Sequence, residues 1–164
     1  MRKIIFLDID GVLNSMDYFE QTKNCKGYTG TINPEKVKLL KKIVDRTGAE
    51  IVLSSTWRDL AKRKDEPEHP MYTYLTDILQ EYGLKIIEHT PYIDMNRPKE
   101  IKAWLDSQPD TDIKFVSLDD DFPQQKYDEV GIGDCLVRTI FFKKDGGLQH
   151  EHVEKAIAIL NQEE

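Results

Sequence analysis

Short apolar runs alternate along the chain with stretches in which apolar residues recur every three or four positions. The first pattern is typical of strands buried on both faces, and the second is typical of helices with one buried face. We therefore expect strands at residues 3–7, 51–53, 84–87, 113–118 and 136–142. Helices are expected from Asn33-Pro34 to Gly48, over residues 71–82, from Pro98 onward, and over residues 153–160.

This alternation of strands and helices predicts an α/β fold. Strands joined through helices form right-handed crossovers, so we expect one Rossmann-like domain over residues 1–164, with a mostly parallel five-stranded sheet and helices on both faces. The polar stretch 14–32 is long enough for a flap but too short for an independent cap domain, so no large cap is expected. Ligands of such sheets bind at the carboxyl ends of the strands, and functional residues are expected there.

The composition narrows the classes of function. Among 164 residues, 30 acidic against 23 basic side chains give a net charge of -7, which argues against nonspecific nucleic-acid binding but not against a nucleic-acid end as substrate. No apolar run approaches the roughly 18 residues of a membrane span, so no membrane partner is expected. Cys25 and Cys135 form no metal or disulfide pattern, which indicates a reducing, cytoplasmic setting.

Acidic residues follow two of the expected strands. The first strand runs into Asp-Ile-Asp-Gly at residues 8–11, and the fourth runs into three aspartates at residues 119–121. Adjacent carboxylates raise one another's pKa unless a cation or hydrogen bonds compensate, and Mg²⁺ prefers oxygen ligands of this kind. Each segment alone could be a solvated acidic turn, but their shared position at strand ends indicates a metal site.

Hydroxyl and cationic side chains follow other strand ends. Residues 54–56 (Ser-Ser-Thr) lead into an expected helix start, where hydroxyls and backbone amides can bind an anion or simply cap the helix. Arg58 begins a basic run that continues at residues 62–64 and could contact a polynucleotide backbone, although a solvated helix face is the simpler interpretation. At the next helix start, Arg97 or Lys99 could reach a bound phosphate.

The order of these features resembles that of the haloacid dehalogenase (HAD) superfamily of phosphatases and phosphotransferases. The opening Asp-x-Asp-Gly-Val-Leu-Asn at residues 8–14 is the most specific part, and the likeness continues through residues 54–58, 118–121 and 139–160. The later segments are most similar to small capless HAD domains grouped with nucleic-acid-repair phosphatases.

The resemblance also implies a role for each candidate residue. Asp8 would be the nucleophile that forms an aspartyl-phosphate, and Asp10 would be the acid and base that serves the leaving group and the water. The Mg²⁺ ligands would be Asp8, the backbone carbonyl of Asp10, Asp120 and, as a second choice, Asp119. Asp121 would support the loop. The phosphate-binding residues would come from Ser54, Ser55, Arg58 and either Arg97 or Lys99.

The expected activity is Mg²⁺-dependent hydrolysis of phosphomonoesters, with nucleic-acid or nucleotide phosphate ends as candidate substrates. The alternatives are a small-metabolite phosphatase or phosphotransferase, a nuclease that uses the same metal pocket, and a non-catalytic phosphate-binding or regulatory domain. A non-catalytic domain would be expected to lose one of the two motif acids, and both are present. The sequence leaves the substrate and the oligomeric state open.

Overall fold

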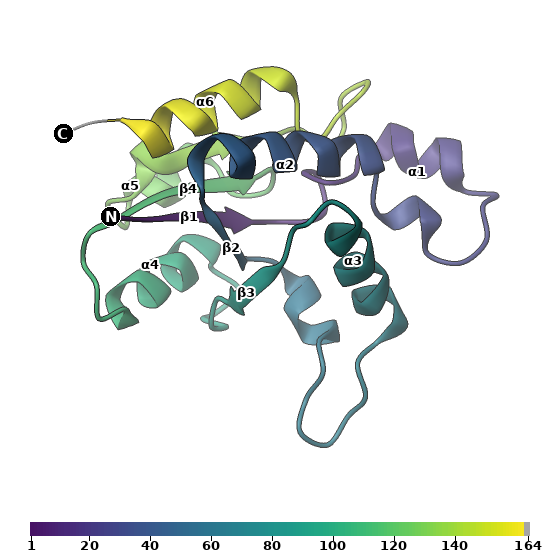
Figure 1. Cartoon of the computed structure of the whole chain (residues 1–164), viewed down its shortest axis with the longest axis horizontal. Helices are drawn as coiled ribbons and strands as arrows, with labels where there is room; N and C mark the ends of the chain where they lie inside the picture. Colours follow the sequence, from purple (N-terminus) through teal and green to yellow (C-terminus); the bar gives the residue numbers. More distant parts are fainter. Residues whose placement is uncertain (163–164) are drawn as a thin grey trace.

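The sheet organises the chain. The computed structural model describes residues 1–162 and contains five strands in the order β3-β2-β1-β4-β5 (Figure 1). Every neighbouring pair is parallel, so the expected five-stranded α/β sheet is confirmed and is parallel throughout. The strands are β1 (Arg2–Leu7), β2 (Glu50–Leu53), β3 (Ile86–His89), β4 (Ile113–Asp119) and β5 (Leu136–Arg138).

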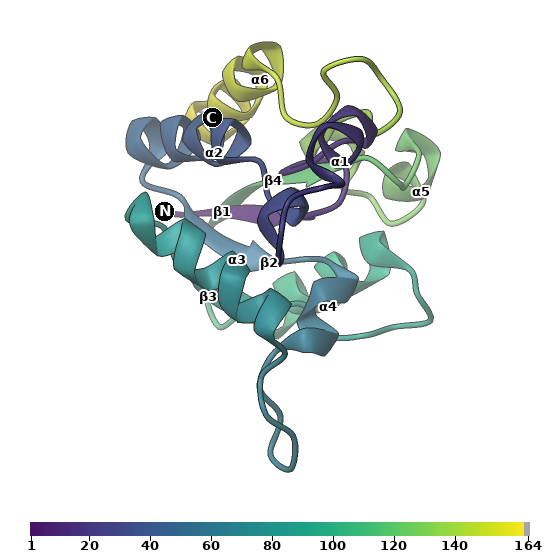
Figure 2. The ribbon, with the colours of Figure 1, turned by 90° about the vertical axis from the view of Figure 1, so that its right-hand side faces the viewer.

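Helices cover both faces of the sheet, as expected. Alternate residues of β1 enter two hydrophobic layers, Ile5 and Leu7 on one face and Ile4 and Phe6 on the other. The first layer is covered by α2, α3 and α6, and the second by α4 and α5; Figure 2 shows α2 and α6 on the opposite side of the sheet from α4. The α-helices are α1 (Met16–Thr22), α2 (Pro34–Thr47), α3 (Pro70–Glu81), α4 (Arg97–Ser107), α5 (Gln124–Asp128) and α6 (His150–Asn161).

The boundaries of α2 follow from capping residues in the sequence. The Asn33 side chain accepts a hydrogen bond from the Glu35 amide, and Pro34 occupies the first turn, where its missing N–H has no partner to lose. Gly48 ends the helix with a left-handed φ of 70°. These local signals are why the predicted and observed boundaries of this helix agree.

Two strands differ from the expectation at their ends. β5 ends at Arg138 rather than at Phe142, because its neighbour β4 ends at Asp119, the residue paired with Arg138. β4 does not extend beyond that pair, and Ile140 and Phe142 are 53% and 79% exposed. β3 begins and ends two residues later than expected, because its pairing with β2 starts at Ile86.

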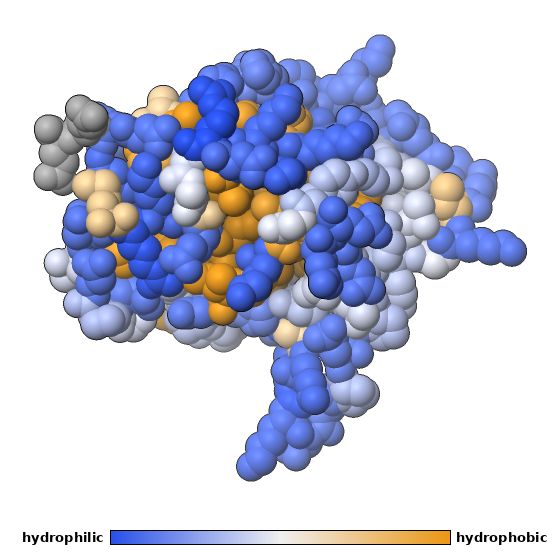
Figure 3. Space-filling model, viewed as in Figure 1, coloured by the Kyte–Doolittle hydropathy of each residue, from blue (hydrophilic) through white to orange (hydrophobic). Residues whose placement is uncertain are grey.

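Two segments extend from the carboxyl edge of the sheet. The expected flap 14–32 contains α1 and a short 3-10 helix, η1, which contact each other. The helix expected after residues 54–56 is only the short η2, and residues 61–69 then project from the body (Figures 1 and 2) as a largely hydrophilic arm (Figure 3). Among residues 1–162, no helix is both long and apolar enough to cross a membrane. The 3-10 helices are η1 (Thr29–Thr31), η2 (Thr56–Leu60) and η3 (Gly133–Cys135).

Candidate active site

The end of β1 delivers Asp8 to the carboxyl edge of the sheet, where the chain turns sharply. The Asp8 amide continues the hydrogen bonding with β4, and the Val12 amide then donates to the Ile9 carbonyl at 3.0 Å. Gly11 lies in this turn with φ of 80°, and a Cβ atom there would lie 2.1 Å from Cγ of Asp120. The turn therefore requires glycine for its backbone conformation and for the close approach of an acid.

Asp10 lies on the exposed side of the same turn, with its carboxylate held by two neighbours. The side-chain nitrogen of Asn14 donates to one carboxylate oxygen of Asp10 at 2.9 Å, and the indole nitrogen of Trp57 donates to the other at 3.2 Å. Asn14 is buried, and its side-chain oxygen also accepts from the Gly11 amide at 2.8 Å. Asn14 and Trp57 therefore orient Asp10. Both lie in segments that resemble HAD motifs, yet the sequence alone did not indicate this role.

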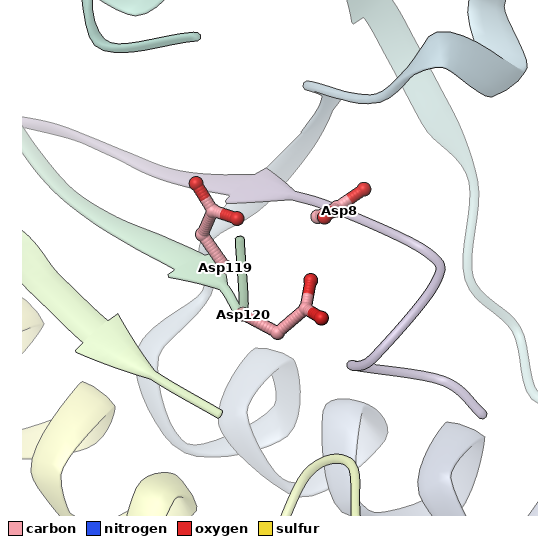
Figure 4. Close-up of side chains that lie close together, drawn as sticks. All are labelled: Asp8, Asp119 and Asp120. Carbon is pink, nitrogen blue, oxygen red and sulfur yellow. The ribbon is translucent and has the colours of Figure 1, made fainter. Parts of the chain in front are cut away.

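Three carboxylates gather where β1 and β4 end. Side-chain oxygens of Asp8, Asp119 and Asp120 lie within 4.8 Å of one another; Asp8 follows β1, Asp119 is the last residue of β4, and Asp120 follows it (Figure 4). Asp119 is fully buried, and its oxygens accept from the Asp121 amide at 3.0 Å and from the Tyr127 hydroxyl at 2.7 Å. The cluster contains the acids that were expected to bind metal through their side chains.

A buried arginine balances part of this negative charge. Arg97 is the first residue of α4, and its Nη1 donates to Asp8 at 2.8 Å and to Asp119 at 3.0 Å. Its guanidinium also lies 5.4 Å from the centre of the Phe122 ring. Lys99, the alternative cation, is exposed instead. The structure therefore places Arg97, and not Lys99, among the acids.

Burial and crowding change the pKa values of this group. Burial, reinforced by the charges of Asp119 and Asp120, holds the pKa of Asp8 well above its ordinary value despite the opposing charge of Arg97. Burial and the neighbouring Asp119 raise the pKa of Asp120 to about 6. Burial lowers the pKa of Arg97, but Asp8 and Asp119 outweigh it, and the net pKa is raised. One arginine does not offset these carboxylates, and their oxygens fit a hard divalent cation such as Mg²⁺.

The loop after β2 brings hydroxyl groups to the same edge of the sheet. The Ser54 hydroxyl and the Nε of Arg97 are buried, and neither has a hydrogen-bond partner among residues 1–162. Buried donors without a partner cost free energy, and oxygens of a bound anion are suitable partners for both. The Ser55 hydroxyl instead accepts from the Trp57 amide at 3.2 Å and caps η2.

A pocket of about 200 Å³ opens among these groups, and we call it the acid pocket. Phe141, from the loop after β5, forms part of its wall and packs edge-to-face on Phe19 of α1, with ring centres 5.6 Å apart. The expected flap therefore supports one wall through this contact. The acid pocket is lined by Asp8, Asp10, Thr56, Arg97, Asp120, Asp121 and Phe141.

Arg58 does not line the acid pocket and lies beside it. Its Nη2 pairs with Glu100 at 3.0 Å, and its Nη1 donates to the Ser55 carbonyl at 3.2 Å. Residues 62–64, the rest of the basic run, lie on the projecting arm and line neither this pocket nor the neighbouring one that contains Arg58. The structure therefore places Arg58 outside the acid pocket and pairs it with a buried acid.

A buried threonine ties two parts of the site together. Thr139 follows β5, and its hydroxyl donates to the Gly11 carbonyl at 2.6 Å while its amide donates to the Asp119 carbonyl at 3.0 Å. The turn that carries Asp8 and Asp10 is thereby fixed relative to the end of β4. No local pattern indicates this role, because Thr139 and Gly11 are 128 positions apart.

Comparison with known families agrees with this geometry. A family model described as "HAD domain in Swiss Army Knife RNA repair proteins" matches residues 4–153. The matched span includes every residue that lines the acid pocket. A comparison with curated proteins gave no match. The HAD resemblance of the sequence is thus confirmed over most of the chain.

Proposed function

The chain belongs to the family of HAD domains in Swiss Army Knife RNA repair proteins, and we propose that it is a Mg²⁺-dependent phosphomonoesterase acting on phosphorylated nucleic-acid ends. The observation that carries this proposal is a single pocket lined by Asp8, Asp10, Arg97 and Asp120. Phosphoryl transfer asks a protein mainly for positioning and charge compensation, and these side chains supply both.

In the first step, a carboxylate oxygen of Asp8 attacks the phosphorus in line with the ester oxygen. The bond between Asp8 and phosphorus forms as the bond to the ester oxygen breaks, and protonated Asp10 gives its proton to that oxygen. The products are the free alcohol and an aspartyl-phosphate. The hydrogen bonds from Asn14 and Trp57 support this role, because they hold the Asp10 carboxyl at a defined place beside the pocket.

In the second step, the Asp10 carboxylate takes a proton from water while the water oxygen attacks phosphorus. The bond between phosphorus and Asp8 breaks, which releases inorganic phosphate and restores the Asp8 carboxylate. Arg97 and Ser54 stabilise the phosphoryl oxygens in both steps. This assignment is supported by the buried Nε and hydroxyl donors, which lack partners among residues 1–162.

Asp8, Asp120 and the backbone carbonyl of Asp10 would hold Mg²⁺. When bound, the ion neutralises negative charge on the phosphoryl oxygens and on the crowded carboxylates. Asp119 is less suited to hold the ion, because it is fully buried and does not line the acid pocket, whereas Asp8 and Asp120 do. We therefore assign Asp120 as the direct ligand and Asp119 as the residue that positions Arg97.

The proposed substrate is the phosphorylated end of a nucleic acid. The family match supports this class, and within residues 1–162 no separate cap domain encloses the acid pocket. The phosphate at the end of a long chain can therefore enter while the rest of the chain stays outside. The net charge of -7 gives little attraction for a long backbone, so contacts near the terminus must provide most of the binding.

Phosphate release from a panel of compounds tests this proposal. The panel contains 3′- and 5′-phosphorylated RNA and DNA oligonucleotides, mononucleotides and sugar phosphates, each with Mg²⁺ and with EDTA. We expect Mg²⁺-dependent release from at least one oligonucleotide end, at a higher kcat/KM than from the small compounds. Release only from small compounds would indicate a small-metabolite phosphatase, and no release from any compound would indicate a phosphate-binding domain.

A further inference from the structure

A second pocket adjoins the acid pocket, and of its lining residues only the shared Arg97 takes part in the steps above. Its volume is about 240 Å³, and it shares Thr56, Arg97 and Asp121 with the acid pocket. A group attached to a phosphate in the acid pocket can therefore enter the second pocket directly. The remaining lining residues are Arg58, Asp59, Tyr92, Met95, Glu100 and Phe122.

An exposed aromatic ring forms one wall of this second pocket. Tyr92 is 63% exposed and the neighbouring Met95 is 72% exposed. The Arg58 guanidinium lies over the Tyr92 ring, 5.8 Å from its centre, and Arg58 is itself fixed by its ion pair with Glu100. Tyr92 thus offers an exposed aromatic ring beside the proposed phosphate site, and proteins use such rings to stack nucleic-acid bases.

The loop 91–96, which carries this ring, is held in a strained conformation. Asp94 and Met95 are non-glycine residues with φ of 51° and 53°. Such backbone conformations cost free energy and persist where surrounding contacts impose them, often at ligand sites. Here the Ile93 amide donates to Glu100 at 3.0 Å, so the acid that fixes Arg58 also anchors the loop.

The charges on the walls disfavour a second phosphate in this pocket. Arg58 and Arg97 are already engaged in ion pairs with buried acids, and Asp59 and Asp121 add further carboxylates. Another anion would therefore be repelled. A neutral planar group with amino or hydroxyl donors is compatible with both the aromatic wall and the carboxylates.

We propose that the second pocket binds the nucleoside next to the hydrolysed phosphate, with its base stacked on Tyr92. The proposal rests on the phosphatase function proposed above and deepens it by naming how the same site recognises its substrate. The hydroxyl groups of the sugar and the amino groups of the base face Asp59 and Asp121. Recognition is then concentrated on the terminal nucleotide, in keeping with the acidic chain.

Two oligonucleotide substrates that differ by one base test this proposal. Both carry the same terminal phosphate, but in one the adjacent nucleotide is abasic. Tyr92→Ala is expected to lower kcat/KM about tenfold for the substrate with a base and to leave the abasic substrate unchanged, since the lost stacking exists only with a base. Tyr92→Trp should retain wild-type activity on both substrates. Phe142→Ala removes another exposed aromatic side chain, which packs on Phe141 of the acid pocket with ring centres 4.9 Å apart, so it serves as the control in which any loss is expected to be equal on the two substrates.

The outcomes separate this proposal from the phosphatase function. If the wild-type protein releases phosphate from neither substrate, the proposed function fails. If the wild-type protein hydrolyses both and Tyr92→Ala slows neither, or slows both equally, the function stands and the stacking site is overturned. If Phe142→Ala instead causes the base-dependent loss, the base lies on the loop after β5, and the second pocket is again excluded.

Discussion

Two buried arginines lie at the carboxyl edge of the sheet, each paired with acids from other elements; both line the second pocket, but only Arg97 also lines the acid pocket. Arg97 pairs with Asp8 and Asp119 at 2.8 and 3.0 Å, and Arg58 pairs with Glu100 at 3.0 Å. Each of these side chains is at most 9% exposed. In burial and pair geometry the two sites are therefore alike.

The two pairs differ in what else the paired groups contact. The Glu100 oxygen that binds Arg58 also accepts the Ile93 amide, so this pair joins α4 to a loop. Asp8 has a raised pKa beside other acids, and the Arg97 Nε has no partner among residues 1–162. A buried ion pair that is complete acts as scaffold, whereas one that leaves charge and donors uncompensated marks a site for ligand and chemistry.

The largest expected effect is that of Asp8→Asn. This variant should lower phosphate release by more than about a thousandfold, because an amide cannot attack phosphorus. Its melting temperature should equal or exceed that of the wild type, because asparagine has nearly the same shape and removes a carboxylate from a crowded cluster. Asp10→Asn should also nearly abolish release, because an amide cannot donate or take the proton.

Wild-type turnover in either variant, measured by phosphate release, would exclude the aspartyl-phosphate mechanism proposed here.

The comparison between the two arginines is tested directly by Arg97→Met and Arg58→Met. On a small phosphate, Arg97→Met should lower kcat about a hundredfold, because a donor to the transferred group is lost. Arg58→Met should leave that kcat within a few-fold, but it should lower the free energy of unfolding by about 3 kcal/mol, because Glu100 is left buried without its partner.

Glu100→Gln in the Arg58→Met background is the control for that interpretation. It removes the unpaired charge while keeping an acceptor for the Ile93 amide, so part of the lost stability should return in denaturant unfolding. If Arg58→Met instead slows hydrolysis of the small phosphate as much as Arg97→Met does, Arg58 belongs with the phosphate-binding residues.

A smaller effect is expected from Mg²⁺, and it should depend on pH. The folded, metal-free protein binds protons on Asp8 and Asp120 more tightly than the unfolded chain does, since both pKa values are raised, that of Asp120 to about 6. Their contribution to the free energy of unfolding therefore falls as the pH rises from about 4 to above 6. Mg²⁺ replaces these protons, so it should raise the melting temperature more at pH 7.5 than at pH 5. At a hundredfold excess over its Kd, the ion stabilises by about 2.7 kcal/mol.

Asp120→Asn and Asp121→Asn form a matched pair for this measurement. The first variant should lose most of the stabilisation by Mg²⁺, and the second should keep it. The reverse pattern would assign the ligand to Asp121. If the wild-type protein has the same melting temperature in Mg²⁺ and in EDTA, the proposed metal site is wrong.

The smallest effect is expected from replacing Lys62, Arg63 and Lys64 with alanine. These residues lie on the projecting arm, away from both pockets, so they can attract a polynucleotide only through solvent. At low salt, kcat/KM for a phosphorylated oligonucleotide should fall about two- to fivefold, and the difference should vanish as the salt concentration rises. Turnover of a small phosphate should not change. A loss as large as that of Arg97→Met would make the arm a principal binding surface.

The sequence by itself determined the parts of this protein that depend on neighbouring residues. The spacing of apolar residues indicated the sheet and its covering helices, and capping residues set the boundaries of α2. The acids of the site were also visible, because each follows directly after a strand, and parallel strands bring their carboxyl ends to one edge. The strand β5 was overestimated, because its length depends on where β4 ends and not on its own apolar residues.

Only the tertiary structure decided which side chains meet at that edge. Arg97 and Lys99 are equivalent in the sequence, but residues two apart on a helix point about 200° apart, so the docking of α4 buries one and exposes the other. Arg58 and Glu100 are 42 positions apart, and their pairing depends on how η2 and α4 pack. The position of Tyr92 likewise depends on tertiary structure. Its loop, residues 91–96, is held by the hydrogen bond from the Ile93 amide to Glu100 of α4. Local patterns specify elements, whereas contacts between elements depend on packing that no single segment encodes.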